Sequence, residues 1–204
     1  EESKATSSPQ RNLIRFVELI LTKAFFNLKS EANKNFLQYV WWLLDPLLYM
    51  VVFYIVFGLL LQRGGENYVL FLLTGLIPFQ WFAKAVHLAS GSILGGKGLM
   101  NQLRISPIFF PLVMVVQTTS KQLLAFAMLF AVLLFNHKVP SIQWLGFIPI
   151  VVVQFVLISV VATAVAMLIP FARDLTNLVP TGLQFLMFMS AVFYSSDIIQ
   201  EQWE

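Results

Sequence analysis

Residues 144–171 read WLGFIPIVVVQFVLISVVATAVAMLIPF, a stretch without a charged side chain. The hydrocarbon core of a bilayer is about 30 Å thick, so a spanning helix needs roughly 20 mostly apolar residues at about 1.5 Å each. This stretch exceeds that length, and four other runs approach or exceed it: Trp41–Leu61, Tyr68–Ala89, Ile108–Phe135 and Leu178–Tyr194. The sequence therefore predicts an all-α, polytopic membrane helical bundle with five visible spans.

The composition agrees with a chain whose main solvent is membrane lipid. Hydrophobic residues make up 58% of the chain and charged residues 11%, against about 25% charged in an average soluble domain. The net charge of +3 is too small to indicate a nucleic-acid partner. The chain contains no cysteine, which excludes disulfides and thiolate metal sites.

The basic residues predict the orientation of the spans. With a cytoplasmic N-terminus, the outside loops carry only Arg63 and Lys138. The inside segments then carry nine basic residues: Lys4, Arg11, Arg15, Lys23, Lys29, Lys34, Lys97, Arg104 and Arg173. Cytoplasmic loops of membrane proteins are enriched in lysine and arginine. We therefore expect a multi-pass protein of the cell inner (cytoplasmic) membrane with its N-terminus in the cytoplasm.

The N-terminal segment, residues 1–35, contains an amphipathic stretch from Arg11 to Leu28. Its apolar residues recur at helical spacing: Leu13, Phe16, Val17, Ile20, Leu21, Ala24 and Leu28. Such a helix is expected to lie in the membrane interface, with its apolar face in lipid and its basic face in water. A soluble helix packed on another domain is the alternative. Residues 36–204 form the predicted transmembrane domain.

The polar loop at residues 91–106 begins with Gly91-Ser-Ile-Leu-Gly-Gly96-Lys97, which satisfies most of the phosphate-loop pattern. The pattern fails at Gly98, where a Ser or Thr hydroxyl would hold magnesium, and an apolar helix precedes the loop instead of a strand. We predict instead a short cytoplasmic helix from Leu94 to Leu103 that contacts a partner. A linker without a partner is the alternative. The candidate contact residues are Leu94, Lys97, Met100, Asn101, Leu103 and Arg104.

Three charged residues fall inside the apolar runs, where an unpaired charge is costly. Asp45 and Lys84 lie at similar distances from the cytoplasmic ends of the first two antiparallel runs, so we predict a buried ion pair between them, which serves either a structural or a transport role. His87 is one turn from Lys84 on the same face. Lys121 has no evident carboxylate at matching depth, so we expect it to face a wet cavity or to snorkel.

Four motifs carry a family resemblance: FLQYVWWLLDP at 36–46, FLLTGLIPFQW at 71–81, the polar loop at 90–111, and FARD at 171–174. As a set they resemble the permease subunit of ABC transporters that export polysaccharides of the O-antigen, capsule or teichoic acid class. The resemblance covers the chain from about residue 12 to its end.

The resemblance implies the rest of the assembly. Two permeases form the channel, and a separate ATP-binding subunit binds ATP and magnesium, so that no cofactor is expected in this chain. An amphipathic helix precedes span one, and the loop between spans two and three couples to the ATPase. The resemblance also implies an outer re-entrant hairpin, whose first arm would begin at residues 195–204, and a sixth span. We expect these to lie beyond Glu204 in a longer chain.

The resemblance implies that the substrate is a lipid-linked polysaccharide, and aromatic rings would offer the C–H faces of its sugars a sliding contact. The predicted channel residues are Tyr49, Phe53, Phe185 and Phe188, although aromatic residues also gather in belts at membrane interfaces. An ABC permease for a drug or small lipid is the alternative. A membrane-embedded glycosyl or lipid transferase is less favoured, because the apolar runs hold one carboxylate and no catalytic motif.

Overall fold

A computed structural model describes residues 9–34, 68–103, 105–135, 142–190 and 192, together with residues 41, 44, 45, 47–49, 51, 52 and 54–56 of the first run. The regular elements are α1 (Pro9–Lys34), α3 (Tyr68–Ser90), α4 (Ser92–Gly95), α5 (Lys97–Gln102), α6 (Phe109–Phe135), η2 (Ile142–Gly146), α7 (Phe147–Leu168) and α8 (Leu175–Met189). These residues contain no strand, and the predicted all-α class is confirmed.

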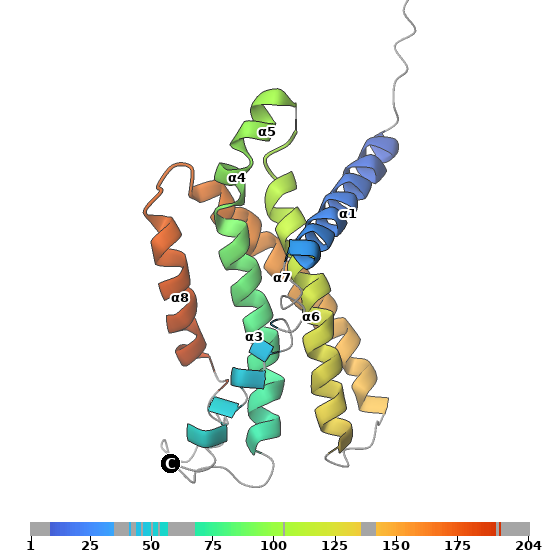
Figure 1. Ribbon diagram of the computed structural model, residues 1–204, viewed down its shortest axis with the longest axis vertical. Coiled ribbons are helices and arrows are strands. Elements are labelled where there is room, and N and C mark those ends of the chain that lie inside the picture. The colour runs from blue at the N-terminus through green and yellow to red at the C-terminus, as the bar shows by residue number, and fades with distance from the viewer. Residues whose placement is uncertain are drawn as a thin grey trace, which may run out of the picture.

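Helix α3 lies at the centre of the bundle and packs against α6, α7 and α8 (Figure 1). Small residues allow the close approach, since Ala85 and Ala89 of α3 and Ala162 of α7 are fully buried in one core cluster. The indole of Trp81 fills the space toward α6, where it meets the ring of Phe126 edge-on at 5.8 Å. Edge-to-face pairs of this kind are the preferred aromatic geometry.

Two glutamines tie the neighbouring helices to α3 where Pro78 interrupts it. Gln122 of α6 donates a hydrogen bond to the carbonyl of Ile77 (3.0 Å), and Gln154 of α7 donates one to the carbonyl of Pro78 (2.7 Å). A carbonyl oxygen has two lone pairs, so it can accept a side-chain amide in addition to its helical N–H. Each bond fixes the axial position of one helix against α3.

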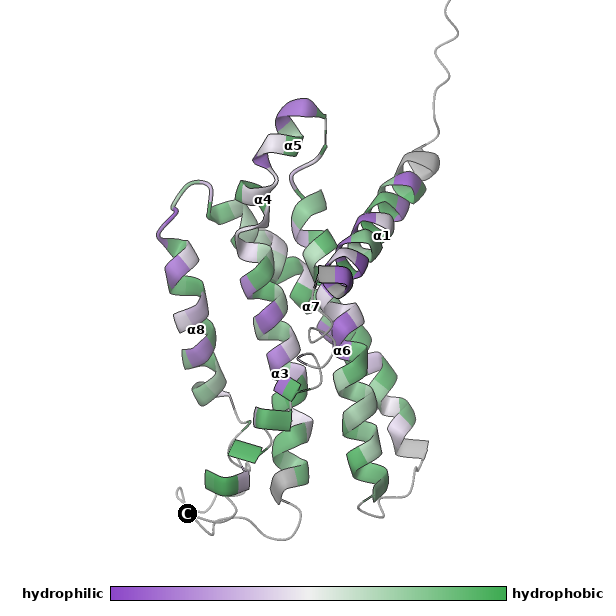
Figure 2. Cartoon of the chain, in the orientation of Figure 1, coloured by the Kyte–Doolittle hydropathy of each residue, from purple (hydrophilic) through white to green (hydrophobic). Residues whose placement is uncertain are grey.

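Within the described residues, three helices are long and apolar enough to cross a membrane: Leu70–Gly95, Phe109–Phe135 and Trp144–Leu168. Figure 2 shows the lower half of α6 almost entirely hydrophobic, while polar residues are frequent on α1 and α5. Valines of α7 remain exposed, Val153 at 68% and Val160 at 63%. Lipid is the solvent that suits such a surface.

The other two predicted spans differ from expectation. Of the 21 residues of the first run, Trp41–Leu61, ten lie outside the described residues. The fifth run was expected at Leu178–Tyr194, whereas α8 spans Leu175–Met189. Its 15 residues extend about 22 Å, which is less than the thickness of the hydrocarbon core. The predicted hairpin arm at 195–204 also lies outside the described residues.

Helix α1 runs obliquely across α6 (Figure 1) and is longer than the predicted Arg11–Leu28. Its Ile20 and Ala24 are buried against Phe109, Phe110 and Val113 of α6. The adjacent face stays exposed and is apolar, with Ile14, Val17, Leu21 and Phe25 among its residues. One stripe of the helix therefore packs on the bundle, and the next is free to meet lipid.

Candidate functional site

Asp45 and Lys84 form an ion pair in the structure. The Lys84 Nζ lies 3.0 Å from the Asp45 Oδ2. The predicted burial is wrong for the single chain, because 48% of the Lys84 side chain and 45% of the Asp45 side chain remain exposed. The pair faces the side of α3 toward α8, a side that the bundle leaves partly open. His87 is also exposed there.

Lys121 has the carboxylate partner that the sequence did not reveal. It forms an ion pair with Glu31 of α1, and Glu31 also accepts a hydrogen bond from Gln117. Gln117 in turn accepts a hydrogen bond from Asn27 (3.2 Å). Residues four apart share a helix face, so Asn27 and Glu31 of α1 match Gln117 and Lys121 of α6. That shared spacing was the available signal. Hydrophobic periodicity alone predicts that this helix lies at the membrane interface and does not pair it with α6.

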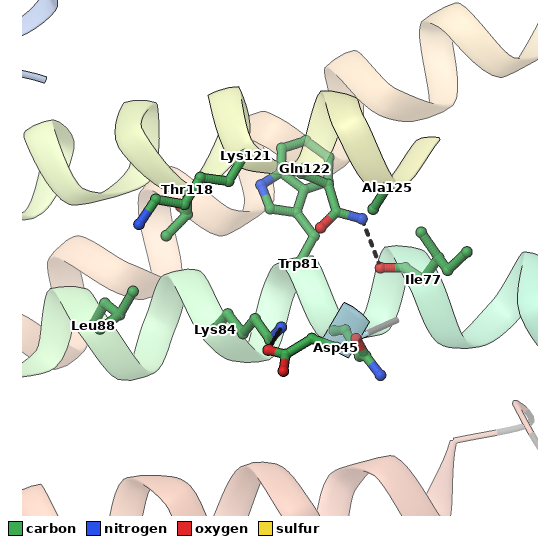
Figure 3. A pocket seen from close by; sticks show the side chains of 10 residues that line it. Asp45, Ile77, Trp81, Lys84, Leu88, Thr118, Lys121, Gln122 and Ala125 are labelled. Carbon is green, nitrogen blue, oxygen red and sulfur yellow. Dashed lines mark hydrogen bonds and ion pairs between the residues drawn. The ribbon is translucent and has the colours of Figure 1, made fainter. Parts of the chain in front are cut away.

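The two ion pairs flank a polar cavity of about 180 Å³ between the first span, α3 and α6 (Figure 3). The lining residues are Asp45, Ile77, Gln80, Trp81, Lys84, Leu88, Thr118, Lys121, Gln122 and Ala125. In Figure 3, Trp81 points from α3 toward Gln122 on α6, and Asp45 reaches Lys84 from the opposite side. The predicted wet cavity beside Lys121 therefore has a counterpart in this space.

A second cavity, of about 390 Å³, lies between the first span, α3 and α8. Its lining mixes rings with polar groups: Tyr49, Phe79, Gln80, Ala83, Lys84, His87, Pro180, Leu183, Gln184 and Met187. Of the three predicted channel residues that the structure describes, only Tyr49 lines it. Phe185 and Phe188 do not, and they are exposed at 65% and 58%. Phe53 lies outside the described residues. The structure thus does not bring the four predicted channel residues together.

The predicted single helix from Leu94 to Leu103 is two short helices, α4 and α5, that meet at Gly96. Lys97, Asn101 and Leu103 are exposed, whereas Leu94 and Met100 are half-buried. The side chain of Arg104 lies outside the described residues. Figure 1 places α5 at the tip of the bundle, at the same end as the α7–α8 connection.

The phosphate-loop resemblance has no structural counterpart. A phosphate loop leaves its backbone N–H groups free to surround the phosphate. Here the Gly95 N–H donates to the Gly91 carbonyl (3.0 Å), and the Gly96 N–H donates to the Ser92 carbonyl (2.9 Å). Both groups are therefore occupied by α4 itself.

A second apolar cluster connects α5 with α1. Phe109, Phe110 and Val113 of α6 form its centre with Ile20 and Ala24 of α1. Met100 of α5 packs against the same cluster. The loop predicted to contact a partner and the predicted interfacial helix therefore share one packed unit on α6, a relation that the sequence alone did not show.

The fold and these sites define a multi-pass helical membrane protein with polar cavities inside the bundle. No protein-family model matches the chain. The chain is 28% identical to the O-antigen export system permease protein RfbA of Klebsiella pneumoniae, over 94% of this chain and 74% of that protein. It is 23% identical to the protein of the same name from Myxococcus xanthus, over the same shares.

A shorter match relates the chain to a capsule protein. The polysialic acid transport protein KpsM of Escherichia coli is 29% identical over 45% of this chain and 37% of that protein. The resemblance to polysaccharide-exporter permeases that the motifs predicted is confirmed by these relatives.

Proposed function

We propose that the chain is the channel-forming permease subunit of an ATP-driven exporter that moves lipid-linked polysaccharide across the cytoplasmic membrane. The observation that carries the proposal is the similarity to O-antigen export permeases over 94% of the chain. The three long apolar helices and the aromatic and polar cavity beside Tyr49 support it.

The surface around α5 suits a partner ATP-binding subunit. Leu99 and Leu103 are exposed there, at 36% and 53%, beside the polar Lys97 and Asn101. Apolar side chains rimmed by polar ones are typical of a protein interface. ATP and magnesium would then be bound by the partner. We infer that α1 and α5 then face the cytoplasm, the side on which the N-terminus is expected.

A channel for a polymer needs more room than one chain supplies. The cavity beside Tyr49 holds about 390 Å³, a size typical of a small-molecule pocket. Closed two-fold dimers are the commonest oligomers, so we propose that two copies face each other and that Tyr49, Phe53, Phe185 and Phe188 line the space that the pair encloses.

Reconstitution tests the function directly. The permease and its ATPase, placed in liposomes with lipid-linked O-antigen, are expected to move the glycan across the bilayer when ATP is added. An ATPase variant that binds but does not hydrolyse ATP serves as the control. The permease alone is expected to hydrolyse no ATP. Transport of a fluorescent phospholipid or a hydrophobic drug, without transport of the glycan, would favour the small-molecule alternative and contradict the proposal.

A further inference from the structure

The connection between α7 and α8 carries the most exposed large hydrophobic side chain in the part of the chain that the structure describes. The ring of Phe171 is 90% exposed. Burial of such a ring by a partner is strongly favourable, since aromatic side chains dominate the energetics of interfaces. Single exposed apolar residues are nevertheless common on protein surfaces, so the surroundings of Phe171 decide whether the ring meets lipid, water or a protein.

The backbone on both sides of Phe171 is held by hydrogen bonds and by one buried side chain. The N–H groups of Phe171 and Ala172 both donate to the Leu168 carbonyl, at 3.0 and 3.3 Å. The Leu175 N–H donates to the Ala172 carbonyl at 3.1 Å. Ile169 is fully buried in the bundle. A ring presented on an ordered backbone loses little conformational entropy when a partner covers it.

The position of Phe171 along the chain favours a place outside the hydrocarbon core. Helix α7 has 22 residues and extends about 33 Å, enough to cross a core about 30 Å thick. Phe171 follows the end of that helix, and the exposed charges of Arg173 and Asp174 come directly after it. Charged side chains are costly in hydrocarbon, and the aromatic residues enriched at membrane interfaces are tryptophan and tyrosine. A protein partner therefore suits this ring better than lipid does.

Phe171 belongs to the same end of the protein as α5. Helix α4, which directly precedes α5, packs against α7, and Figure 1 shows the α7–α8 connection beside α4. Leu99 and Leu103 of α5 are exposed at this end, close in sequence to the exposed Lys97. Phe171 likewise has the exposed Arg173 two residues away. The two loops thus share an arrangement that is typical of a protein interface, apolar side chains rimmed by polar ones.

We propose that Phe171 anchors the ATP-binding subunit, which buries the ring in an apolar pocket next to its contact with α5. The assignment rests on the proposed function, since it adds a second contact to the surface through which the permease binds that subunit. Two separate contacts fix the orientation of the ATPase, whereas α5 alone leaves it free to pivot. A movement of the ATPase then acts on α7 and α8 directly, as well as on α3 and α6 through α4 and α5.

The affinity of the purified ATPase for the permease in nanodiscs tests the assignment. Phe171→Ala is expected to weaken binding about tenfold or more, the loss typical of a central aromatic contact. The exposed ring contributes little to the fold, so the melting temperature of the permease should not change. Phe135→Ala is the matched control, because Phe135 is 84% exposed but ends α6 at the opposite end of the bundle (Figure 1). Unchanged ATPase affinity of Phe171→Ala would overturn the proposal.

A fluorescent label at the same position identifies what covers it. The chain contains no cysteine, so Phe171→Cys can be labelled there alone with bimane, whose emission shifts to the blue in apolar surroundings. In nanodiscs we expect the emission of a water-exposed label, and a blue shift when the ATPase is added. A blue shift already present without the ATPase would assign the position to lipid, and oxidative cross-linking of two unlabelled Phe171→Cys permeases would assign it to a second copy. Either result would overturn the proposal.

The unmodified proteins separate this proposal from the proposed function. If the unmodified permease binds the ATPase and exports glycan while Phe171→Ala does both equally well, only the role of Phe171 is wrong. If the unmodified permease fails to bind the ATPase, the proposed function itself is contradicted.

Discussion

A Cβ atom placed on Gly96 would lie 2.3 Å from the ring of Phe110. The glycine thus lets the junction of α4 and α5 rest directly on α6. Phe110 also belongs to the cluster that holds α1. We therefore expect a displacement of α5 to shift α6 and α1 as well.

Gly96→Ala is expected to push the Phe110 ring aside and to destabilise the end of the bundle that carries α5. Overpacking of this kind typically costs about 1–3 kcal/mol. Thermal unfolding in detergent measures the loss of stability, and the ratio of glycan export to ATP hydrolysis measures coupling. Gly98→Ala is the matched control, because a Cβ there meets nothing within 4 Å. Equal effects of the two substitutions would contradict this role for the contact.

Leu103→Asp should weaken the association with the ATPase without disturbing the fold. The Leu103 side chain is 53% exposed, so a carboxylate there remains solvated in the free chain but would be desolvated in an apolar interface. Co-purification of the two subunits measures the effect. Met100→Asp, unlike Leu103→Asp, should also lower thermal stability, because Met100 packs in the cluster with Phe110. Full ATPase association of Leu103→Asp would show that the loop is only a linker.

The pair of Asp45 and Lys84 should show energetic coupling. Asp45→Asn or Lys84→Gln alone leaves the other charge without its partner. The double substitution should therefore cost less than the two single losses added together, by about 0.2–1 kcal/mol, the range for ion pairs that remain in contact with solvent. The coupling is measured as a double-mutant cycle, from the melting temperatures of the unmodified protein, the two single variants and the double variant in nanodiscs. Asp45→Asn combined with Lys97→Gln is the control, and its effects should add. Additive losses for Asp45 and Lys84 would mean that solvent screens the pair.

The ion pair between Glu31 and Lys121 should hold α1 against α6. Glu31→Lys places two like charges together and is expected to expose α1 to limited proteolysis. Glu31→Lys combined with Lys121→Glu should restore protection, because the swap re-forms the pair. Glu18→Lys, on an exposed part of the same helix, is the control and should have little effect. Failure of the swap to restore protection would assign the docking of α1 to its apolar contacts alone.

Cysteine labelling can map the water-filled path in this naturally cysteine-free chain. Cysteines at Tyr49 and Gln184 should react with a water-soluble maleimide in the assembled exporter, since both residues line the cavity beside α8. Cysteines at Val153 and Val160 should be protected by lipid. Cysteines at Phe185 and Phe188 should react only if a second copy completes an aqueous channel there. Labelling of the α7 cysteines together with protection at Tyr49 would contradict the proposed channel wall and would place the aqueous path along α7.

The sequence by itself determined the helical membrane class, most of the boundaries of α3, α6 and α7, and the pairing of Asp45 with Lys84. Each follows from local rules: the length of an apolar run against the bilayer, and equal depth on adjacent antiparallel helices. The family resemblance likewise rests on contiguous motifs, which survive at low overall identity.

Only the tertiary structure decided how α1 meets the bundle, and with it the partner of Lys121. The hydrophobic pattern of α1 predicts an apolar face. It does not distinguish a face that meets lipid from one that packs on a helix, because apolar side chains are favourable in both environments. The same ambiguity affected the aromatic residues of α8. The sequence shows that Phe185 and Phe188 are apolar. The rotation of α8, which packs Val179 and Leu183 against the core, decides which way the two rings point.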